Sequence, residues 1–283
     1  MSILINKIVY ELKLRTIPNI HNQLTSYTKQ KRDNEIISLN YNDPDLVEFF
    51  AKIQEYTRVH GRRQVPTIEE LKSMELYLKQ ATIRLPRERK AIILLGLPGA
   101  GKSTSIRKIG ISTDDYFTVD SDIYKSGVMN ETDKTWSLSP LQQSYLGGVD
   151  VEHVHEVSAK LAKLSLIKIL EAGINVVIPK VGNSIKGLKK LVKQLNENDY
   201  SIEIVYVHAT ISTCLKRNLS RYLSINKDCY PRIVNPKLIF DFGYRPMYNF
   251  FKIEISKVIG SFIMINNEKN TPSRIYFNFN KKA

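Results

Sequence analysis

The sequence has few of the features that mark disulfide-stabilised, zinc-binding or membrane-spanning proteins. It contains only two cysteines, Cys214 and Cys229, and no histidines accompany them at metal-ligand spacing, so neither a disulfide framework nor a zinc site is predicted. No run of about 18 apolar residues occurs, and charged residues soon interrupt the apolar start at 3–5, which argues against a membrane span and a signal peptide. We therefore expect a protein of a reducing cytoplasm, with no membrane partner.

Internal repeats and low-complexity linkers are also absent from the sequence. The chain has 283 residues, of which 42% are hydrophobic and 25% are charged, proportions that are typical of a globular protein. That length is sufficient for one sizeable core, with or without a smaller appended layer.

Negative charge is in short supply, since 42 lysines and arginines face 28 acidic residues and leave a net charge of +14. Such a surface attracts polyanions, so nucleic acid stays open as a partner. Most of the lysines are scattered, however, and any site that binds phosphate groups needs positive charge. Only Lys186, Lys189, Lys190 and Lys193 form a stripe at helical spacing, which indicates either a solvated helix face or a nucleic-acid contact.

Residues 1–89 are predicted to form an N-terminal helical region. Asp43-Pro44 is typical of a helix start, and the apolar residues that follow recur at helical intervals. A second helix is predicted to begin at Thr67, because Glu70 three residues later completes a capping box. The region carries no catalytic motif, so we expect it to pack as a helical layer on the main domain.

From residue 90 to residue 283 the pattern changes to strand-length apolar runs that alternate with helical segments. This alternation predicts an α/β domain with a parallel sheet and helices on both faces. The predicted strands are residues 91–95, 117–120, 175–178, 202–209 and 262–265, and the predicted helices are residues 102–109, 151–172, 184–196 and 212–223.

A phosphate-binding loop is the strongest motif. The stretch Gly-Leu-Pro-Gly-Ala-Gly-Lys-Ser at 96–103 has the spacing G-x-x-x-x-G-K-[ST], and it lies between a predicted buried strand and a predicted helix. Gly96, Gly99 and Gly101 permit the tight conformations in which backbone N–H groups, that of Ala100 included, converge on phosphate oxygens. The motif predicts a P-loop kinase-like fold that binds ATP or GTP.

The residues that close the loop have distinct expected roles. Lys102 is expected to contact the β- and γ-phosphates, and the Ser103 hydroxyl is expected to complete the coordination of Mg²⁺. Thr104 is expected to support these contacts. The alternative, a glycine-rich turn with an incidental lysine, is disfavoured by the strand and the helix on either side.

Two aspartates, Asp120 and Asp122, lie at the end of the next predicted strand. Ligands of parallel sheets bind at the carboxyl ends of the strands, which places this pair beside the loop. A kinase needs a carboxylate that orients the acceptor hydroxyl and takes its proton, and we assign that role to Asp122. Asp120 is expected near the metal or the acceptor. Two ordinary strand-end or helix-cap aspartates are the structural alternative.

Arginines of the C-terminal half are candidates for charge stabilisation during phosphoryl transfer. Arg217 and Arg221 are four residues apart on a predicted helix and share a face, and Arg232 follows in a loop. A guanidinium can bind two phosphate oxygens at once, so we expect Arg221 and Arg232 to clamp the transferring group. An ordinary surface position is the alternative for each of them.

Three further side chains are weaker candidates. Arg245 is an additional candidate for phosphate contact. Trp136 and Tyr124 have rings that can stack on a base or a sugar, although burial in the core explains an aromatic residue equally well.

Together these motifs resemble the zeta toxin family over about residues 90–240. The resemblance includes the loop at 96–104, Val-Asp-Ser-Asp-Ile-Tyr at 119–124 and the helix-to-strand stretch at 167–178. It continues through Leu-Lys-Arg-Asn-Leu-Ser-Arg-Tyr at 215–222 and Arg-Ile-Val-Asn-Pro at 232–236. The loop alone is common to many families, whereas the ordered set of motifs is considerably more specific.

The resemblance implies a P-loop kinase that phosphorylates a sugar hydroxyl of UDP-N-acetylglucosamine. In that family the second aspartate of the D-x-D motif is the catalytic base, which falls on Asp122. The two family arginines that contact the transferring phosphate match Arg221 and Arg232. The resemblance further implies a toxin, or an effector delivered to another cell, with a neutralising antitoxin protein as a partner.

The chain departs from the family after its third predicted strand. Many members have Glu-Gly-Thr there, whereas this sequence has Pro-Lys-Val-Gly-Asn at 179–183. We interpret the difference as a subgroup with altered substrate contacts, to which Lys180 and Asn183 are assigned. A solvated loop lysine is an equally good interpretation of Lys180. A NAD-type dinucleotide is the second candidate acceptor after UDP-N-acetylglucosamine.

The preferred function from the sequence is a kinase that moves the γ-phosphate of ATP or GTP, with Mg²⁺, to a hydroxyl of a nucleotide-like small molecule. A polynucleotide 5′-hydroxyl kinase is the first alternative, and it needs the same loop and base together with a basic channel. A non-enzymatic nucleotide-binding partner protein is the second alternative. The D-x-D motif and the paired arginines argue against it.

Overall fold

The fold is described from a computed structural model. The structure describes residues 65–125, 128–129, 136–137, 155–223, 234, 236–255, 260–268 and 272–277. The helix predicted after Asp43-Pro44 lies outside these residues.

In the described part of the chain, one large sheet has the strand order β2-β5-β1-β6-β7-β8. The strands from β2 to β7 are all parallel, and β8 pairs antiparallel with β7 at the edge. A separate short antiparallel pair is formed by β3 and β4. The strands are β1 (Lys90–Leu95), β2 (Phe117–Thr118), β3 (Val128–Met129), β4 (Trp136–Ser137), β5 (Val176–Lys180), β6 (Ser201–His208), β7 (Gly260–Asn266) and β8 (Ser273–Phe277).

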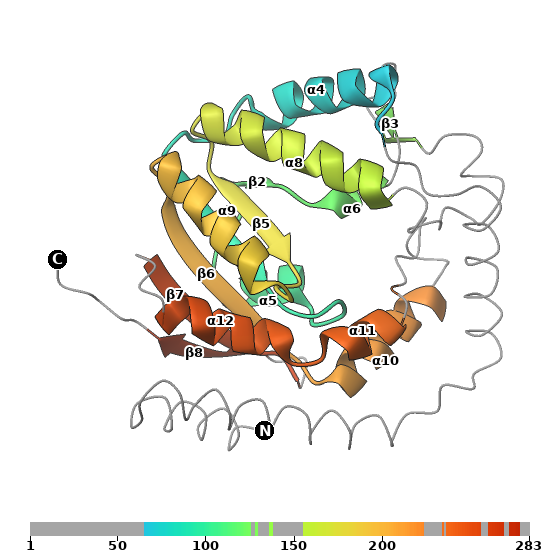
Figure 1. Cartoon of the computed structure of the whole chain (residues 1–283), viewed down its shortest axis with the longest axis vertical. Helices are drawn as coiled ribbons and strands as arrows, with labels where there is room; N and C mark the ends of the chain where they lie inside the picture. The colour runs from blue at the N-terminus through green and yellow to red at the C-terminus, as the bar shows by residue number, and fades with distance from the viewer. Residues whose placement is uncertain are drawn as a thin grey trace.

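Helices cover both faces of the sheet, as predicted. The chain crosses the sheet in one direction from β1 to β2, and in the opposite direction from β2 to β5, from β5 to β6 and from β6 to β7. Because such crossovers are right-handed, α5 lies on one face of the sheet, and α8, α9 and α12 lie on the other. Figure 1 shows α8, α9 and α12 in front of the strands and α5 behind them. The helices are α4 (Ile68–Thr82), α5 (Lys102–Lys108), α6 (Ser121–Lys125), α8 (His155–Glu171), α9 (Ile185–Glu197), α10 (Ile211–Leu223), α11 (Pro236–Phe242) and α12 (Arg245–Ile255).

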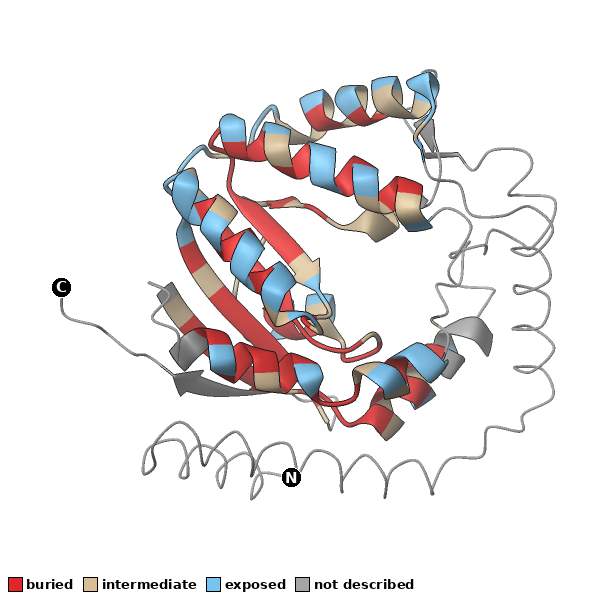
Figure 2. Ribbon diagram, viewed as in Figure 1, coloured by how far each residue is buried: buried red, intermediate tan, exposed pale blue. Residues whose placement is uncertain are grey.

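The core lies between the sheet and these helices. Every residue of β1 from Ala91 to Leu95 is buried, which agrees with the continuous apolar run expected of a central parallel strand. Figure 2 shows β5 and β6 mostly buried, and the helices α8, α9 and α12 buried on one side and exposed on the other. In α9 the buried side carries Leu188, Leu191, Val192 and Leu195. Removal of these apolar side chains from water stabilises the layers against each other.

The helix predicted at Thr67 is confirmed as α4. The Thr67 hydroxyl accepts a hydrogen bond from the Glu70 N–H at 3.1 Å, and the Glu70 carboxylate accepts one from the Thr67 N–H at 2.8 Å, which completes the capping box. Met74 and Leu78 are buried in the same core as the sheet. Glu75 forms an ion pair with Lys168 of α8 at 2.9 Å. This helix therefore packs as a layer on α8.

Several element boundaries differ from those predicted from the sequence. The strand predicted at 117–120 ends at Thr118, because the chain turns at Asp120 into the short helix α6. The sequence pattern did not predict α6, α11, α12, β3, β4 or β8. Helix α12 packs on β6 and α9, so it depends on neighbours that are distant in the sequence, whereas β8 pairs antiparallel with β7, the strand that precedes it in the chain.

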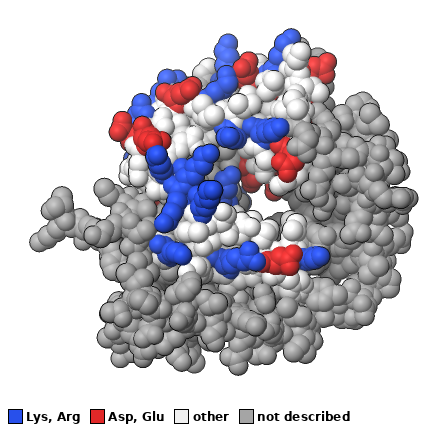
Figure 3. Space-filling view, in the orientation of Figure 1, with Lys and Arg blue, Asp and Glu red and all other residues white. Residues whose placement is uncertain are grey.

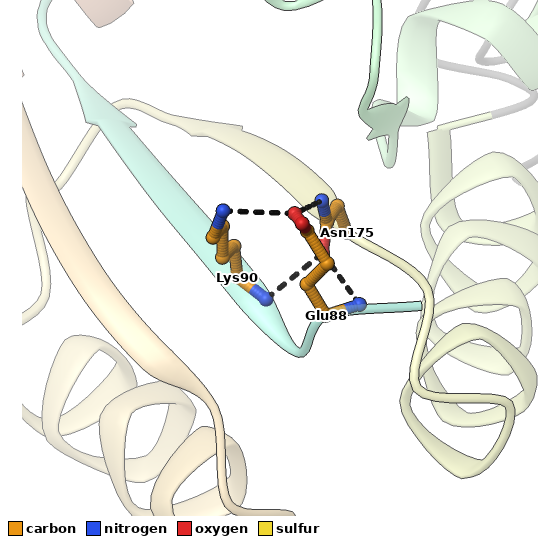
Figure 4. Close-up of polar contacts among 3 residues, drawn as sticks. All are labelled: Glu88, Lys90 and Asn175. Carbon is orange, nitrogen blue, oxygen red and sulfur yellow. Dashed lines mark hydrogen bonds and ion pairs between the residues drawn. The ribbon is translucent and has the colours of Figure 1, made fainter. Parts of the chain in front are cut away.

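A buried asparagine holds the amino ends of β1 and β5 together (Figure 4). The Asn175 Oδ1 atom accepts hydrogen bonds from the N–H groups of Glu88 and Lys90, both at 3.1 Å, and its Nδ2 donates to the Glu88 carboxylate at 2.9 Å. Lys90 pairs with the same carboxylate at 2.8 Å. The hydrogen bonds from Lys90 and Asn175 hold the pKa of Glu88 below its ordinary value. The asparagine therefore fixes where β1 begins relative to β5.

We expect Asn175→Ala to lower the free energy of unfolding by about 2 kcal/mol, because it removes a fully buried amide and leaves two backbone N–H groups without their acceptor. Urea unfolding measures this loss. The matched control is Asn196→Ala on the exposed face of α9, which is expected to change stability by less than about 0.5 kcal/mol. Equal stability of the two variants would contradict the role assigned to Asn175.

Candidate functional site

The loop between β1 and α5 has a backbone that only glycine adopts easily. Gly96, Gly99 and Gly101 have φ angles of 151°, 82° and 81°. Space is short as well, since a Cβ atom at Gly96 would lie 2.7 Å from the Val207 carbonyl oxygen, and one at Gly99 would collide with the Cys214 carbonyl oxygen. The loop is thus pressed closely against β6 and α10.

Lys102 is folded back over this loop. Its Nζ donates hydrogen bonds to the carbonyl oxygens of Gly96 at 3.0 Å and Leu97 at 3.2 Å. Ser103 and Thr104, in the first turn of α5, have exposed side chains. The loop therefore presents an ammonium group and two hydroxyl groups beside its backbone N–H groups.

The two aspartates lie at the turn from β2 into α6. The Asp120 carboxylate accepts a hydrogen bond from the Asp122 N–H at 3.0 Å, and its carbonyl accepts one from the Ile123 N–H at 3.2 Å. Asp120 therefore also caps the helix, which was the structural alternative considered for it. Asp122 follows in the first turn of α6 and is half-buried.

The sheet brings the loop and the aspartates to one edge. Thr118 of β2 pairs with Val177 of β5, and Lys180 at the end of β5 pairs with Leu95, just before the loop. With β5 between them, β2 and β1 are about 10 Å apart.

Lys180 lies between these two groups, at the carboxyl end of β5. Its side chain is exposed, but it lies close enough to the surrounding protein that desolvation lowers the pKa of its ammonium group, while the nearby Asp120 carboxylate acts in the opposite direction. Asn183 is half-buried in the loop that follows. That loop is held by a hydrogen bond of 2.8 Å from Asn249 to the Gly182 carbonyl.

The candidate arginines are placed differently from one another. Arg221 belongs to α10, but its side chain lies outside the described residues, as does the whole of Arg232. The Arg217 guanidinium donates to the carbonyl oxygens of Ala100 at 3.3 Å and Asn267 at 2.7 Å, so it contacts the loop itself. Arg245 donates to the Asp241 carbonyl at 2.8 Å, where α11 approaches α12.

The ring of Tyr124 belongs to the core. Its hydroxyl lies 2.6 Å from the Ser165 Oγ in α8, and burial raises the pKa of Tyr124 to about 12 despite that hydrogen bond. Of the two roles considered for it, burial is therefore the correct one. The side chain of Trp136 lies outside the described residues, and its backbone pairs with that of Met129.

A polar turn, which was not predicted from the sequence, lies directly after β7. Asn267 is buried and donates from Nδ2 to the Ala100 carbonyl at 2.8 Å. Glu268 accepts from the Thr210 N–H at 2.7 Å, and from the hydroxyl groups of Thr210 at 2.6 Å and Thr213 at 2.7 Å. The rule that parallel strands place ligand-binding groups at their carboxyl ends would have drawn attention to this turn.

Glu268 anchors the start of α10. Burial alone would raise the pKa of its carboxyl group, but the hydrogen bonds from Thr210 and Thr213 outweigh that effect and hold the pKa below its ordinary value of 4.5. The ionised carboxylate thus ties the turn after β7 to the helix that carries Arg217 and Arg221.

The lysines predicted to form a stripe lie on the solvent side of α9, and Figure 3 shows a cluster of basic side chains over that helix. One of them, Lys193, lies 3.5 Å from Glu197 of the same helix. Within the described ranges, no group of three histidine, cysteine or acidic side chains is placed to hold a metal ion. In the same ranges, no helix combines the length and the apolar character needed to cross a membrane.

A family model described as an AAA domain matches residues 92–229, which include the loop and the aspartates. No curated protein matches the chain.

Among solved structures, the chain is similar to one from the PezAT chromosomal toxin-antitoxin system of Streptococcus pneumoniae, with 21% identity and a TM-score of 0.57 over 75% of this chain and 81% of that chain. It is also similar to a structure of AvrRxo1-ORF1:AvrRxo1-ORF2 with sulphate ions, with 16% identity and a TM-score of 0.54 over 78% of this chain and 75% of that chain. What these proteins share with the chain is the fold. The predicted α/β, P-loop kinase-like fold is confirmed.

We expect Glu268→Gln to lower the free energy of unfolding by about 2 kcal/mol at neutral pH, because an amide replaces a carboxylate that accepts three hydrogen bonds. The pKa of this carboxyl group is lower in the folded protein than in the unfolded chain. The ionised Glu268 carboxylate therefore stabilises the folded protein fully at pH values above the pKa of the unfolded chain, and this stabilisation is lost as the pH falls through the lower pKa of the folded protein.

Urea unfolding at pH 7 and at about pH 3 measures this difference, which is expected to shrink in acid. Glu197→Gln, on the exposed surface of α9, is the control and is expected to change stability by less than about 0.5 kcal/mol at either pH. An equal loss for Glu268→Gln at both pH values would rule out a contribution from the ionised carboxylate.

Proposed function

We propose that this protein is a kinase of the zeta toxin type, which transfers the γ-phosphate of ATP or GTP to a hydroxyl of a nucleotide-like small molecule. The observation that carries the proposal is the meeting of a phosphate-binding loop and the D-x-D aspartates at one edge of a parallel sheet. The proposed kinase domain comprises residues 90–283, with residues 1–89 as an N-terminal helical region.

The loop from Gly96 to Thr104 binds the triphosphate in this proposal. Its glycines allow backbone N–H groups to approach the phosphate oxygens. Lys102 donates hydrogen bonds to the carbonyl oxygens of Gly96 and Leu97. It exchanges these for charged oxygens of the β- and γ-phosphates, which form stronger, charge-assisted hydrogen bonds.

Asp122 is the proposed base. It accepts the proton of the acceptor hydroxyl while the acceptor oxygen forms a bond to the γ-phosphorus and the bond to the β-phosphate oxygen breaks, which leaves a nucleoside diphosphate. Asp120 holds Asp122 in place through the hydrogen bond from the Asp122 N–H. Arg221 and Arg232 are proposed to bind the oxygens of the transferring group.

The side chains present fit Mg²⁺, which prefers oxygen ligands. The exposed Ser103 hydroxyl and the Asp120 carboxylate are the proposed holders of the ion, together with phosphate oxygens of the nucleotide. When bound, the ion would neutralise charge on the β- and γ-phosphates.

The acceptor is proposed to carry a negative charge, with UDP-N-acetylglucosamine first and a NAD-type dinucleotide second. Lys180 supports this, because it lies beside Asp120 at the carboxyl end of β5. Asn183, in the following loop, is proposed as a second acceptor contact. By its likeness to the structure from a toxin-antitoxin system, we also propose that the protein acts as a toxin or effector and has an antitoxin partner.

We expect Asp122→Asn to reduce phosphoryl transfer by about 100-fold or more while nucleotide affinity stays within about threefold, because the base is lost but the loop is intact. The assay follows radioactive γ-phosphate from ATP and GTP to UDP-N-acetylglucosamine, NAD, nucleosides and a 5′-hydroxyl oligonucleotide. Asp115→Asn, an exposed aspartate before β2, is the control and should retain full transfer.

The label distinguishes the candidate functions. If the unaltered protein labels a small molecule and the Asp122→Asn variant does not, the result supports the proposed function and identifies the acceptor. Label on the oligonucleotide alone would overturn the small-molecule assignment in favour of a polynucleotide kinase. Undiminished transfer by the variant would exclude Asp122 as the base.

We expect Lys180→Ala to raise the KM for the acceptor by about tenfold or more with little change in kcat, because it removes a charged hydrogen-bond donor to the bound acceptor. Lys186→Ala, on the exposed side of α9, removes the same charge nearby and should leave KM within about twofold. Equal kinetic constants in the two variants would place Lys180 outside the acceptor site.

A further inference from the structure

One carbonyl group of the phosphate loop, that of Ala100, is held from two sides. Asn267 Nδ2, in the turn after β7, donates to it at 2.8 Å, and Arg217 Nη1, on α10, donates to it at 3.3 Å. The arginine is separated from Ala100 by 117 residues in the sequence, and the asparagine by 167. The loop is therefore held at this peptide by two distant elements.

The two donors are themselves fixed. The other Arg217 nitrogen, Nη2, donates to the Asn267 carbonyl at 2.7 Å, and the Asn267 N–H donates to the His208 carbonyl at 2.8 Å. A Cβ atom added at Gly101 would collide with Asn267 Nδ2 and would lie 3.7 Å from Arg217 Nη1. The loop and the two donors are therefore in close contact at Gly101.

The orientation of this carbonyl determines the direction of the next N–H group. The peptide between Ala100 and Gly101 is trans, as are all the described peptide bonds, and in a trans peptide the C=O and the N–H point in opposite directions. Since Arg217 and Asn267 hold the oxygen on their side, the Gly101 N–H points away from them. Within the described residues, this N–H makes no hydrogen bond to the protein.

We propose that Arg217 and Asn267 are positioning residues, which fix the Ala100–Gly101 peptide so that the Gly101 N–H faces the bound phosphate. They act through the peptide and do not contact the nucleotide. The inference rests on the proposed phosphate-binding role of the loop. It also assigns Arg217 a task different from that proposed for Arg221, which follows four residues later in α10.

A direct charge effect of Arg217 is the competing explanation, because any cation near the loop attracts phosphate. Asn267 carries no charge, so its removal tests the orientation of the peptide alone. Arg217→Lys keeps the charge but loses the planar group that reaches two carbonyl oxygens at once. The two substitutions together therefore separate orientation from charge.

The experiment measures the Kd of inorganic tripolyphosphate by calorimetry for the whole protein and for Asn267→Ala, Arg217→Ala, Arg217→Lys and the double alanine variant. Each single variant, the lysine variant included, is expected to bind about tenfold more weakly than the unaltered protein. The fold-increase in Kd for the double alanine variant should be smaller than the product of the fold-increases for the two single alanine variants, because both residues hold the same carbonyl.

Matched controls are Lys216→Ala, which removes a neighbouring exposed charge of α10, and Asn196→Ala, which removes an exposed amide of α9. Both should bind tripolyphosphate within about twofold of the unaltered protein. Thermal unfolding of each variant checks that it is folded. The ¹H–¹⁵N signal of Gly101 is the readout that a general loss of stability would not move, and it should shift in both Asn267→Ala and Arg217→Lys.

Wild-type affinity in Asn267→Ala, with an unshifted Gly101 signal, would overturn the inference. So would full rescue by Arg217→Lys, because charge would then account for the effect. Failure of the unaltered protein to bind tripolyphosphate, or equal binding by Lys102→Ala, would instead overturn the proposed function of the loop and the inference with it.

Discussion

Parallel pairing of β1 with both of its neighbours is the constraint on which the rest of the structure depends. β1 is buried throughout Ala91–Leu95 and pairs with β5 on one side and β6 on the other. Because the three strands run in the same direction, the loop after β1 and the Lys180 end of β5 leave the sheet at the same edge. β2 and β7 extend this edge to the aspartates and to the Asn267 turn. Backbone pairing of the strands thus brings the loop, the aspartates, Lys180 and the Asn267 turn to one edge of the sheet.

Two buried asparagines secure the opposite ends of this arrangement. Asn175 binds backbone N–H groups where β1 begins, and Asn267 binds a backbone carbonyl in the loop after β1 ends. Irregular segments have no strand partner for their polar groups, so a buried side-chain amide supplies one. The loop consequently has a defined shape before any ligand binds, which lowers the cost of binding.

The charged groups near the carboxyl ends of the strands have different contacts. Lys102 donates to two carbonyl oxygens of the loop, and within the described part of the chain no carboxylate lies at ion-pair distance from Lys180. Glu268, the acidic group of the turn after β7, is instead satisfied by two threonines. An anion that approaches Lys180 therefore does not have to displace an ion pair within the described part of the chain.

The sequence by itself determined the features whose chemistry is local. The loop at 96–103, the aspartates at 120 and 122 and the capping box of α4 are patterns of nearby residues, and such spacing encodes backbone conformation directly. The alternation of apolar runs and helical segments likewise predicted the parallel sheet. Strand ends were less certain, because Asp120 turns the chain where the apolar pattern alone would have continued the strand.

Only the tertiary structure decided which distant side chains support that loop and which candidates lie in the core. Tyr124 is a core residue because Ser165 of α8 meets its hydroxyl, and Arg217 contacts the loop because α10 packs beside Gly99. The position of Asn267 just after a predicted strand suggests a role at that edge, but its partner is 167 residues away and is not marked by any local pattern. A hydrogen bond over such a separation forms only when the order of the strands brings both groups to one edge, and that order is a property of the whole sheet.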